Sequence, residues 1–192
     1  MTVRKPLIVV ALKQEADSLL ADYDLDVIYT GVGKVNAAYY LTNELAQRKF
    51  DNCLPELVIN YGTAGSASLE KGAIYVVNKF IQRDMDVTPL GFDLSVTPFE
   101  DYPRVLNFSN ALNSSLVCAT GDNFEIKKLN LDYDLVDMES YALAKVCYFE
   151  NIKFLSVKYI SDNANQSAAS DWKSNVSLGE NLFLNWYKSY FK

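Results

Sequence analysis

The sequence predicts an α/β domain built on a central β-sheet. Short runs rich in Val, Ile and Leu alternate along the chain with segments of helical periodicity, and this alternation favours a largely parallel sheet. The runs are nearly continuous in apolar residues, which is typical of strands covered on both faces. Polar and glycine residues follow them directly, as expected where a sheet exposes a ligand-binding edge.

Four apolar runs are predicted as strands. Each is bounded by Gly, Asn or Asp, which favour turns. The runs are Leu7 to Leu12, Leu57 to Tyr61, Ala73 to Val77 and Phe154 to Ile160.

Three segments are predicted as helices. In Lys34 to Arg48, apolar residues recur every three or four positions and would form one buried face. Met138 to Phe149 and Leu178 to Phe191 show the same spacing. Leu90 to Asn113 has weaker periodicity and contains Pro98 and Pro103, so we expect a loop with short local structure. A short strand within this loop is the alternative.

Composition narrows the class of protein. The 192 residues, 49% of them hydrophobic, can form one core, so we expect a single domain over residues 1–192. The net charge of −6 argues against nucleic acid as a partner, because nucleic-acid-binding surfaces concentrate Lys and Arg. The first apolar run is too short for a signal peptide or a membrane span. We expect a cytoplasmic protein that binds a small molecule and no membrane.

Cysteine and histidine content limits the chemistry. Cys53, Cys118 and Cys147 lie far apart, within or beside apolar runs, so we expect buried, reduced thiols and no disulfide or metal site. The chain has no histidine, which removes the most frequent general base and every Ser/His or Cys/His nucleophile. Proton transfer must use carboxylates, Tyr, Lys, Cys or water.

Polar and glycine residues cluster after the predicted strands. The clusters are Lys13-Gln14-Glu15, Thr30-Gly31-Val32-Gly33-Lys34, Gly62-Thr63-Ala64-Gly65 and Ser161-Asp162-Asn163. Since parallel strands end at the same edge of a sheet, these residues are candidates for one ligand site.

Each cluster also has a structural explanation. The two glycine-rich segments would serve equally well as tight turns. Asp137-Met138-Glu139 at the start of a helix fits capping and dipole effects, Asp162 fits an N-cap, and Glu15 fits a solvated first-turn residue. Dinucleotide and Walker motifs are absent from the sequence.

Seven segments in order resemble the motifs of the nucleoside phosphorylase and nucleosidase superfamily, and most closely its bacterial 5′-methylthioadenosine/S-adenosylhomocysteine nucleosidases. They are IVVALKQEADSLL, YTGVGKVNAAYYLTNEL, PELVINYGTAGSASLEKGAIYVVN, RDMDVTPLGF, ATGDNF, DLVDMESYALAKVC and FLSVKYISDNAN, and the resemblance runs from Ile8 to Asn165. It implies a central mixed, curved β-sheet flanked by helices, a homodimer, and a nucleoside substrate with no cofactor.

The resemblance also implies roles for individual residues. Asp162 is similar to the acid that protonates N7 of adenine, with Ser161 beside it. Glu15 is similar to the carboxylate that activates the attacking water, and Thr63 to a small hydroxyl residue near that water. For the ribose, Glu139 resembles the residue that binds its hydroxyls and Met138 the one that packs on it.

The same resemblance implies contacts to the base and the 5′ group. Phe124 would stack on the base, and the backbone at Glu125 or Ile126 would contact its edge. The wall of the 5′-alkylthio region would consist of Leu12, Val32, Val87, Leu90, Phe92 and Trp172.

The sequence departs from the family pattern in three places. The stretch between Phe92 and Leu116 is short, and Lys158 stands where the family usually has an arginine near the water. The histidine common in the segment matching Arg83 to Asp86 is absent. Arg and Lys differ in the contacts that they form, so altered specificity or activity stays open.

The predicted reaction is hydrolysis of an N-glycosidic bond, with one carboxyl as acid and another as base. Phosphorolysis is the first alternative, and it needs converging cations. The arginines are Arg4, Arg48, Arg83 and Arg104, and we expect none of them to follow a strand at the ligand edge at a position that matches a family motif. A nucleoside-binding protein without turnover is the second alternative, although a pure binder has no need of both an acid and a base.

Overall fold

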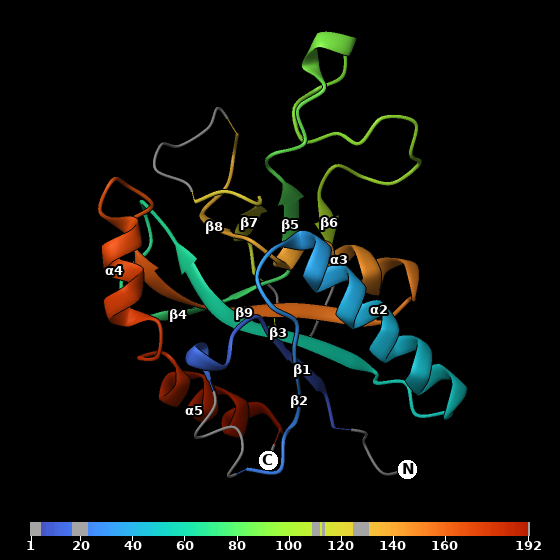
Figure 1. Ribbon diagram of the computed structural model, residues 1–192, viewed down its shortest axis with the longest axis vertical. Coiled ribbons are helices and arrows are strands. Elements are labelled where there is room, and N and C mark those ends of the chain that lie inside the picture. The colour runs from blue at the N-terminus through green and yellow to red at the C-terminus, as the bar shows by residue number, and fades with distance from the viewer. Residues whose placement is uncertain (1–4, 17–22, 109–111, 113, 125–130, 192) are drawn as a thin grey trace.

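The protein folds as a curved β-sheet with helices on both faces (Figure 1). The computed structural model describes residues 5–16, 23–108, 112, 114–124 and 131–191. The strands lie in the order β2-β1-β3-β8-β7-β5-β6, and β9 pairs with both β3 and β4. Within the described ranges, no helix has the length and apolar character needed to cross a membrane.

Parallel strands form the centre of the sheet. They are β1 (Leu7–Val10), β2 (Asp26–Tyr29), β3 (Leu57–Gly65) and β9 (Lys153–Asp162). β1 pairs with β2 and β3, and β9 runs beside β3 along its whole length. The β3–β9 register shifts between Ala64 and Gly65, and Gly65, which still pairs with Asp162 of β9, also pairs with Val136 of β8.

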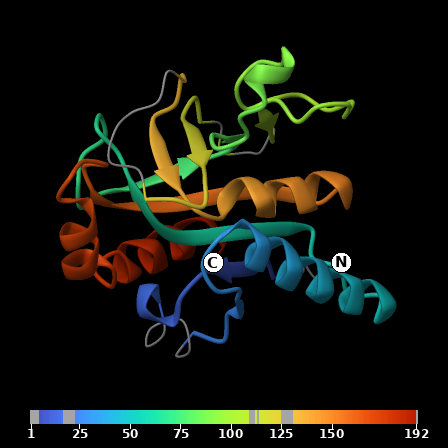
Figure 2. The ribbon, with the colours of Figure 1, turned by 45° about the horizontal axis from the view of Figure 1, so that its top comes forward.

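The rest of the sheet contains shorter strands in both orientations. These are β4 (Ile74–Val77), β5 (Lys79–Gln82), β6 (Leu106–Asn107), β7 (Val117–Thr120) and β8 (Leu135–Asp137). β5, β7 and β8 are parallel, whereas β3–β8, β4–β9 and β5–β6 are antiparallel. In Figure 2, β7 and β8 stand at a steep angle to β3 and β9, which confirms the expected mixed, curved sheet.

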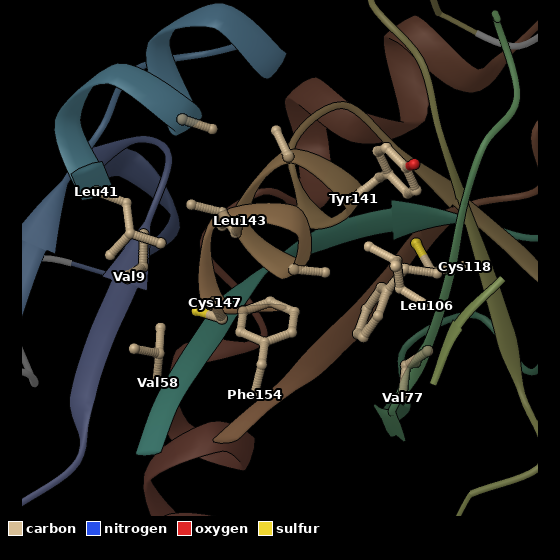
Figure 3. Packing of buried hydrophobic residues seen from close by; sticks show 14 of the residues in the cluster. Val9, Leu41, Val58, Val77, Leu106, Cys118, Tyr141, Leu143, Cys147 and Phe154 are labelled. Atoms are coloured by element: carbon tan, nitrogen blue, oxygen red, sulfur yellow. The ribbon is translucent and has the colours of Figure 1, made fainter. Parts of the chain in front are cut away.

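Alternating side chains of the central strands fill two cores. Val9 and Val58 face α2 (Lys34–Phe50) and α3 (Ser140–Phe149), whose Leu41 and Leu143 complete that core (Figure 3). Ile8 and Ile59 point to the other face, where they pack with Phe183 of α5 (Glu180–Phe191). Burial on both faces explains why the strands read as continuous apolar runs.

The long apolar elements are where the sequence predicts them. All four predicted strands and all three predicted helices are present, with α3 and α5 beginning two residues later than expected. The expected loop after Leu90 does contain a strand, β6. The prediction of buried cysteines is wrong for Cys53, which is exposed beyond the end of α2, and right for Cys118 and Cys147.

Candidate active site

A cavity of about 310 Å³ opens where the strands of the sheet end. Residues that follow β1, β2, β5, β7 and β8 line it, together with the last residues of β3, β8 and β9 and one side chain from α4 (Ala168–Asn175). The lining residues are Ala11, Leu12, Glu15, Val32, Thr63, Ala64, Gly65, Arg83, Asn123, Phe124, Val136, Asp137, Met138, Glu139, Ser161, Asp162 and Trp172.

Most of the site residues predicted from sequence lie in this cavity, although they are spread over the whole chain. They are Leu12, Glu15, Val32, Thr63, Phe124, Met138, Glu139, Ser161, Asp162 and Trp172. Val87, Phe92 and Lys158 do not line it, and Leu90 lies on the surface with 72% of its area exposed. Glu125 and Ile126 lie outside the described residues.

Glu15 ends the 3₁₀ turn Lys13–Glu15, which follows β1, and its side chain is buried in the cavity wall. Its Oε1 accepts hydrogen bonds from the backbone N and the Oγ1 of Thr63, both at 2.8 Å. Its Oε2 accepts one from the backbone N of Leu12 at 3.1 Å. The interpretation of Glu15 as a solvated first-turn residue is therefore wrong.

Thr63 lies in β3 and connects Glu15 to α4. Its Oγ1 accepts a hydrogen bond from Nε1 of Trp172 at 3.0 Å. The same helix reaches the neighbouring strand through Asn175, whose Nδ2 donates to the carbonyl oxygen of Ser161 at 2.9 Å. Helix α4 thus contacts the ends of both β3 and β9.

Asp162 is the last residue of β9, and 4% of its area is exposed. Its Oδ2 accepts a hydrogen bond from Oγ of Ser161 at 2.8 Å, and its Oδ1 accepts one from the backbone N of Ala164 at 2.9 Å. A Cβ on Gly65 would lie 2.6 Å from Oδ1, so only glycine leaves room for this carboxyl. Since α4 begins at Ala168, Asp162 does not cap it.

Glu139 is a second buried glutamate in the cavity wall. Its Oε1 accepts a hydrogen bond from the backbone N of Gly33 at 2.8 Å, which joins the turn before α2 to the start of α3. Burial raises the pKa of Glu139 to about 8, and the negative charge of Asp137 acts in the same direction.

Asp137 and Lys158 form a buried ion pair next to the cavity. The Nζ of Lys158 lies 2.8 Å from Oδ2 of Asp137, and each side chain is 1% exposed. Burial opposes both charges. The pair nevertheless holds the pKa of Asp137 at about 2 and that of Lys158 at about 12. The backbone N of Ser140 donates to Asp137, which confirms its predicted capping contact at the start of α3.

An arginine lies beside the aromatic side of the cavity. Arg83 directly follows β5, and its guanidinium donates to the Oδ1 of Asn123 at 2.9 Å and to the backbone oxygen of Asn123. A Cβ on Gly121 would lie 2.8 Å from the guanidinium carbon. Since Arg83 also begins the RDMDVTPLGF segment, the expectation that no arginine follows a strand at the ligand edge at a position that matches a family motif is wrong. Arg83 braces the segment that carries Phe124.

Charged residues fasten this segment to the turn before α2. The Nζ of Lys34 contacts Asp84 and lies 3.2 Å from Oδ2 of Asp122. The backbone N of Lys34 donates to Asp122, and that of Asp122 donates to Asp84. A Cβ on Gly33 would lie 3.1 Å from Oδ1 of Asp122. These contacts place the 31–34 turn, which touches Glu139, against the segment ending in Phe124.

Seven lining residues were assigned no individual role from the sequence, and most of them adjoin residues that were. Ala11 precedes Leu12, Ala64 and Gly65 follow Thr63, Val136 and Asp137 precede Met138, and Asn123 precedes Phe124. Arg83 is the exception, because β5 was not recognised. Within the part of the chain that the structure describes, no group of three or more Cys, Asp or Glu side chains is placed to hold a metal ion.

Proteins similar to this chain in sequence or structure include nucleosidases and a futalosine hydrolase. A 5′-methylthioadenosine/S-adenosylhomocysteine nucleosidase of Buchnera aphidicola is 29% identical over 179 residues, covering 81% of this chain and 73% of the relative. The S-adenosylhomocysteine nucleosidase of Streptococcus pyogenes, solved with 5-methylthiotubericidin, has a TM-score of 0.77 and 21% identity. The match covers 92% of this chain and 91% of that protein. The futalosine hydrolase of Helicobacter pylori has a TM-score of 0.81 and 20% identity, and the match covers 95% of this chain and 96% of that protein.

These structural similarities confirm the expected fold, a mixed, curled sheet flanked by helices as in the solved nucleosidases. The sequence model of the phosphorylase superfamily matches residues 23–120 and 117–183, which together make up most of the chain. The protein therefore belongs to the phosphorylase superfamily.

Proposed function

We propose that the protein hydrolyses the N-glycosidic bond of an adenine nucleoside such as 5′-methylthioadenosine or S-adenosylhomocysteine and releases adenine. The observation that carries this proposal is the presence of two buried carboxyl groups, Glu15 and Asp162, in one cavity together with an aromatic ring, Phe124. The names of the similar proteins support the choice of substrate.

In the proposed reaction, Asp162 acts on the base. Cleavage leaves negative charge on the departing purine, and a proton delivered to N7 stabilises that charge. Phe124 stacks on the base. The hydroxyl of Ser161 donates to Oδ2 of Asp162 and holds the carboxyl in orientation.

Glu15 acts on the nucleophile. It accepts a proton from a water whose oxygen bonds to C1′ as the bond from C1′ to the base breaks. Glu139 binds the ribose hydroxyls and Met138 packs on the sugar, while Leu12, Val32 and Trp172 line the region of the 5′ substituent. Lys158 acts from behind the cavity wall by balancing the charge of Asp137.

Water is favoured over phosphate as the nucleophile. A phosphate site needs cationic donors around the attacking oxygen. The arginine in the cavity wall, Arg83, is bonded to the Phe124 segment, and the group proposed to receive the nucleophile's proton is a carboxyl surrounded by donors, Glu15. An anionic Glu15 would repel phosphate.

A panel of nucleosides tests this function. The protein is incubated with 5′-methylthioadenosine, S-adenosylhomocysteine, adenosine, inosine and futalosine, with and without phosphate, and chromatography separates free base, free sugar and sugar phosphate. We expect adenine from 5′-methylthioadenosine at a rate that does not depend on phosphate. Strict dependence on phosphate would overturn hydrolysis, and no release from any nucleoside would favour a binding protein.

We also propose that the protein forms a homodimer. Leu90 and Phe99, in the segment after β5, are 72% and 93% exposed and are candidates for the contact between the two copies. Light scattering at micromolar concentration should give twice the mass of the chain, and a monomer would contradict the proposal.

A further inference from the structure

Trp172 is connected to Glu15 by two consecutive hydrogen bonds. The indole Nε1 of Trp172, in α4, lies 3.0 Å from Oγ1 of Thr63. The same oxygen lies 2.8 Å from Oε1 of Glu15. All three residues line the cavity.

The chemistry of these groups fixes the direction of both bonds. An indole N–H donates and cannot accept, so Thr63 Oγ1 must be the acceptor from Trp172. A hydroxyl has a single proton, and an ionised carboxylate only accepts, so the hydroxyl of Thr63 must donate to Glu15. The hydrogen bond from Trp172 thereby orients the Thr63 hydroxyl so that its proton points to Glu15.

The two oxygens of Glu15 differ as a result. Oε1 accepts two hydrogen bonds, from the backbone N and the hydroxyl of Thr63, which occupy both of its lone pairs. Oε2 accepts one, from the backbone N of Leu12. One lone pair of Oε2 therefore remains for a proton.

We propose that Trp172 is a positioning residue that acts through Thr63 on Glu15, so that Oε2 of Glu15 receives the proton of the attacking water. This inference rests on the proposed nucleosidase function. The water gives one proton to Oε2 while its oxygen bonds to C1′, and the electron pair of the broken bond leaves with the base, which takes a proton from Asp162. No other reactant is required.

The competing role for Trp172 is that of a wall. Its ring lines the cavity, and as a wall it would contact the 5′ substituent and affect mainly substrate affinity. The two roles differ in the atom that they need, because a wall needs the ring and a positioning residue needs the indole N–H. Trp172→Phe keeps an aromatic ring and removes the N–H.

The hydrogen bond is tested first, without reference to activity. The chain has two tryptophans, and Nε1 of Trp186 is buried with no hydrogen-bond partner among the described residues, so it is an internal reference. In ¹H–¹⁵N spectra, Thr63→Val should move the Trp172 indole proton upfield and leave that of Trp186 in place, and Thr63→Ser should restore it. An unchanged Trp172 indole proton in Thr63→Val would overturn the inference even if the parent protein is active.

Kinetics then test the role. The kcat of Trp172→Phe should fall roughly 5-fold, which corresponds to about 1 kcal/mol for one lost hydrogen bond, while KM for 5′-methylthioadenosine changes less than about twofold. Thr63→Val should lower kcat at least as much, and adding Trp172→Phe to it should cause no further loss, because both act on the same carboxyl.

Different outcomes would contradict the positioning role of Trp172 and the proposed hydrolysis. Unchanged kcat with raised KM in Trp172→Phe, or independent losses in the double variant, would make Trp172 a wall and overturn the inference while hydrolysis stands. Absence of turnover by the parent protein, with the indole shift as expected, would overturn the proposed function and the catalytic role, and would leave only the hydrogen bond.

Discussion

Glu15 and Glu139 are the same residue type in the same cavity, and both are buried, with 4% and 8% of their area exposed. Glu15 accepts hydrogen bonds from three donors. Glu139 accepts one from Gly33 and lies near the charged Asp137, and its pKa is raised to about 8, first by burial. Because the two carboxyl groups are buried to a similar degree, their environments differ mainly in the hydrogen-bond donors and charges around them.

The two environments fit the two proposed roles. Donors stabilise negative charge, so the surroundings of Glu15 suit a carboxylate that takes a proton from water. The raised pKa of Glu139 favours its protonated form, which offers both an O–H donor and an acceptor to the ribose hydroxyls.

The largest expected effect comes from replacing the carboxyl that is surrounded by donors. Glu15→Gln removes the proton acceptor, so kcat for 5′-methylthioadenosine should fall by ~10²- to 10⁴-fold with little change in KM. Steady-state kinetics measure this effect. The matched variant Glu139→Gln should change kcat little and raise KM only modestly, because a neutral amide resembles the neutral carboxyl. Equal losses of kcat in both variants would break the distinction between the two glutamates.

The next effect concerns the ion pair behind Glu139. Lys158→Met leaves Asp137 as a buried charge without its partner, so the free energy of unfolding should fall by about 3–5 kcal/mol. Urea denaturation measures the loss. The control is Lys49→Met, which breaks an exposed pair with Glu150 and should cost less than about 1 kcal/mol. Lys158→Met/Asp137→Asn should recover part of the stability, and similar losses in the two single lysine variants would contradict the account.

A further effect is a dependence of stability on pH. The folded-state pKa of Glu139, about 8, lies above its ordinary value of 4.5, so the folded state binds this proton more tightly. Its contribution to stability is complete below pH 4.5 and is lost as the pH rises to about 8. The stability of the parent relative to Glu139→Gln should decline over this window, as chemical denaturation at several pH values would show. A flat difference would mean that Glu139 is ionised in the folded protein.

The predictable part of the fold is the part with long apolar patterns. β1, β3, β9 and the helices α2, α3 and α5 bury continuous or periodic apolar residues, and each was recognised. The missed strands β2, β5, β6, β7 and β8 have two to four residues each, too few for a period to appear. Helix α4 has the sequence AASDWKSN, in which only Ala168 is buried.

The site residues that could be predicted are those next to the long apolar elements. Glu15, Thr63 and Asp162 follow or end recognised strands, so the sequence and the family resemblance located them together. Arg83 follows a strand that was not recognised, so its place in the cavity was missed. The hydrogen bond between Trp172 and Thr63 joins residues far apart in the chain, and only the packing of α4 on β9 brings them together.

The most direct test of the proposed acid–base mechanism is Asp162→Asn assayed with two leaving groups. The variant keeps the shape of the side chain but cannot donate a carboxylic proton, so kcat for 5′-methylthioadenosine should fall by ~10²- to 10⁴-fold. A nitrophenyl riboside, whose leaving group departs without a proton, should be cleaved by the variant and the parent at similar rates. Turnover of 5′-methylthioadenosine at close to the parent rate, or equal loss with both substrates, would contradict the role of Asp162 as the acid.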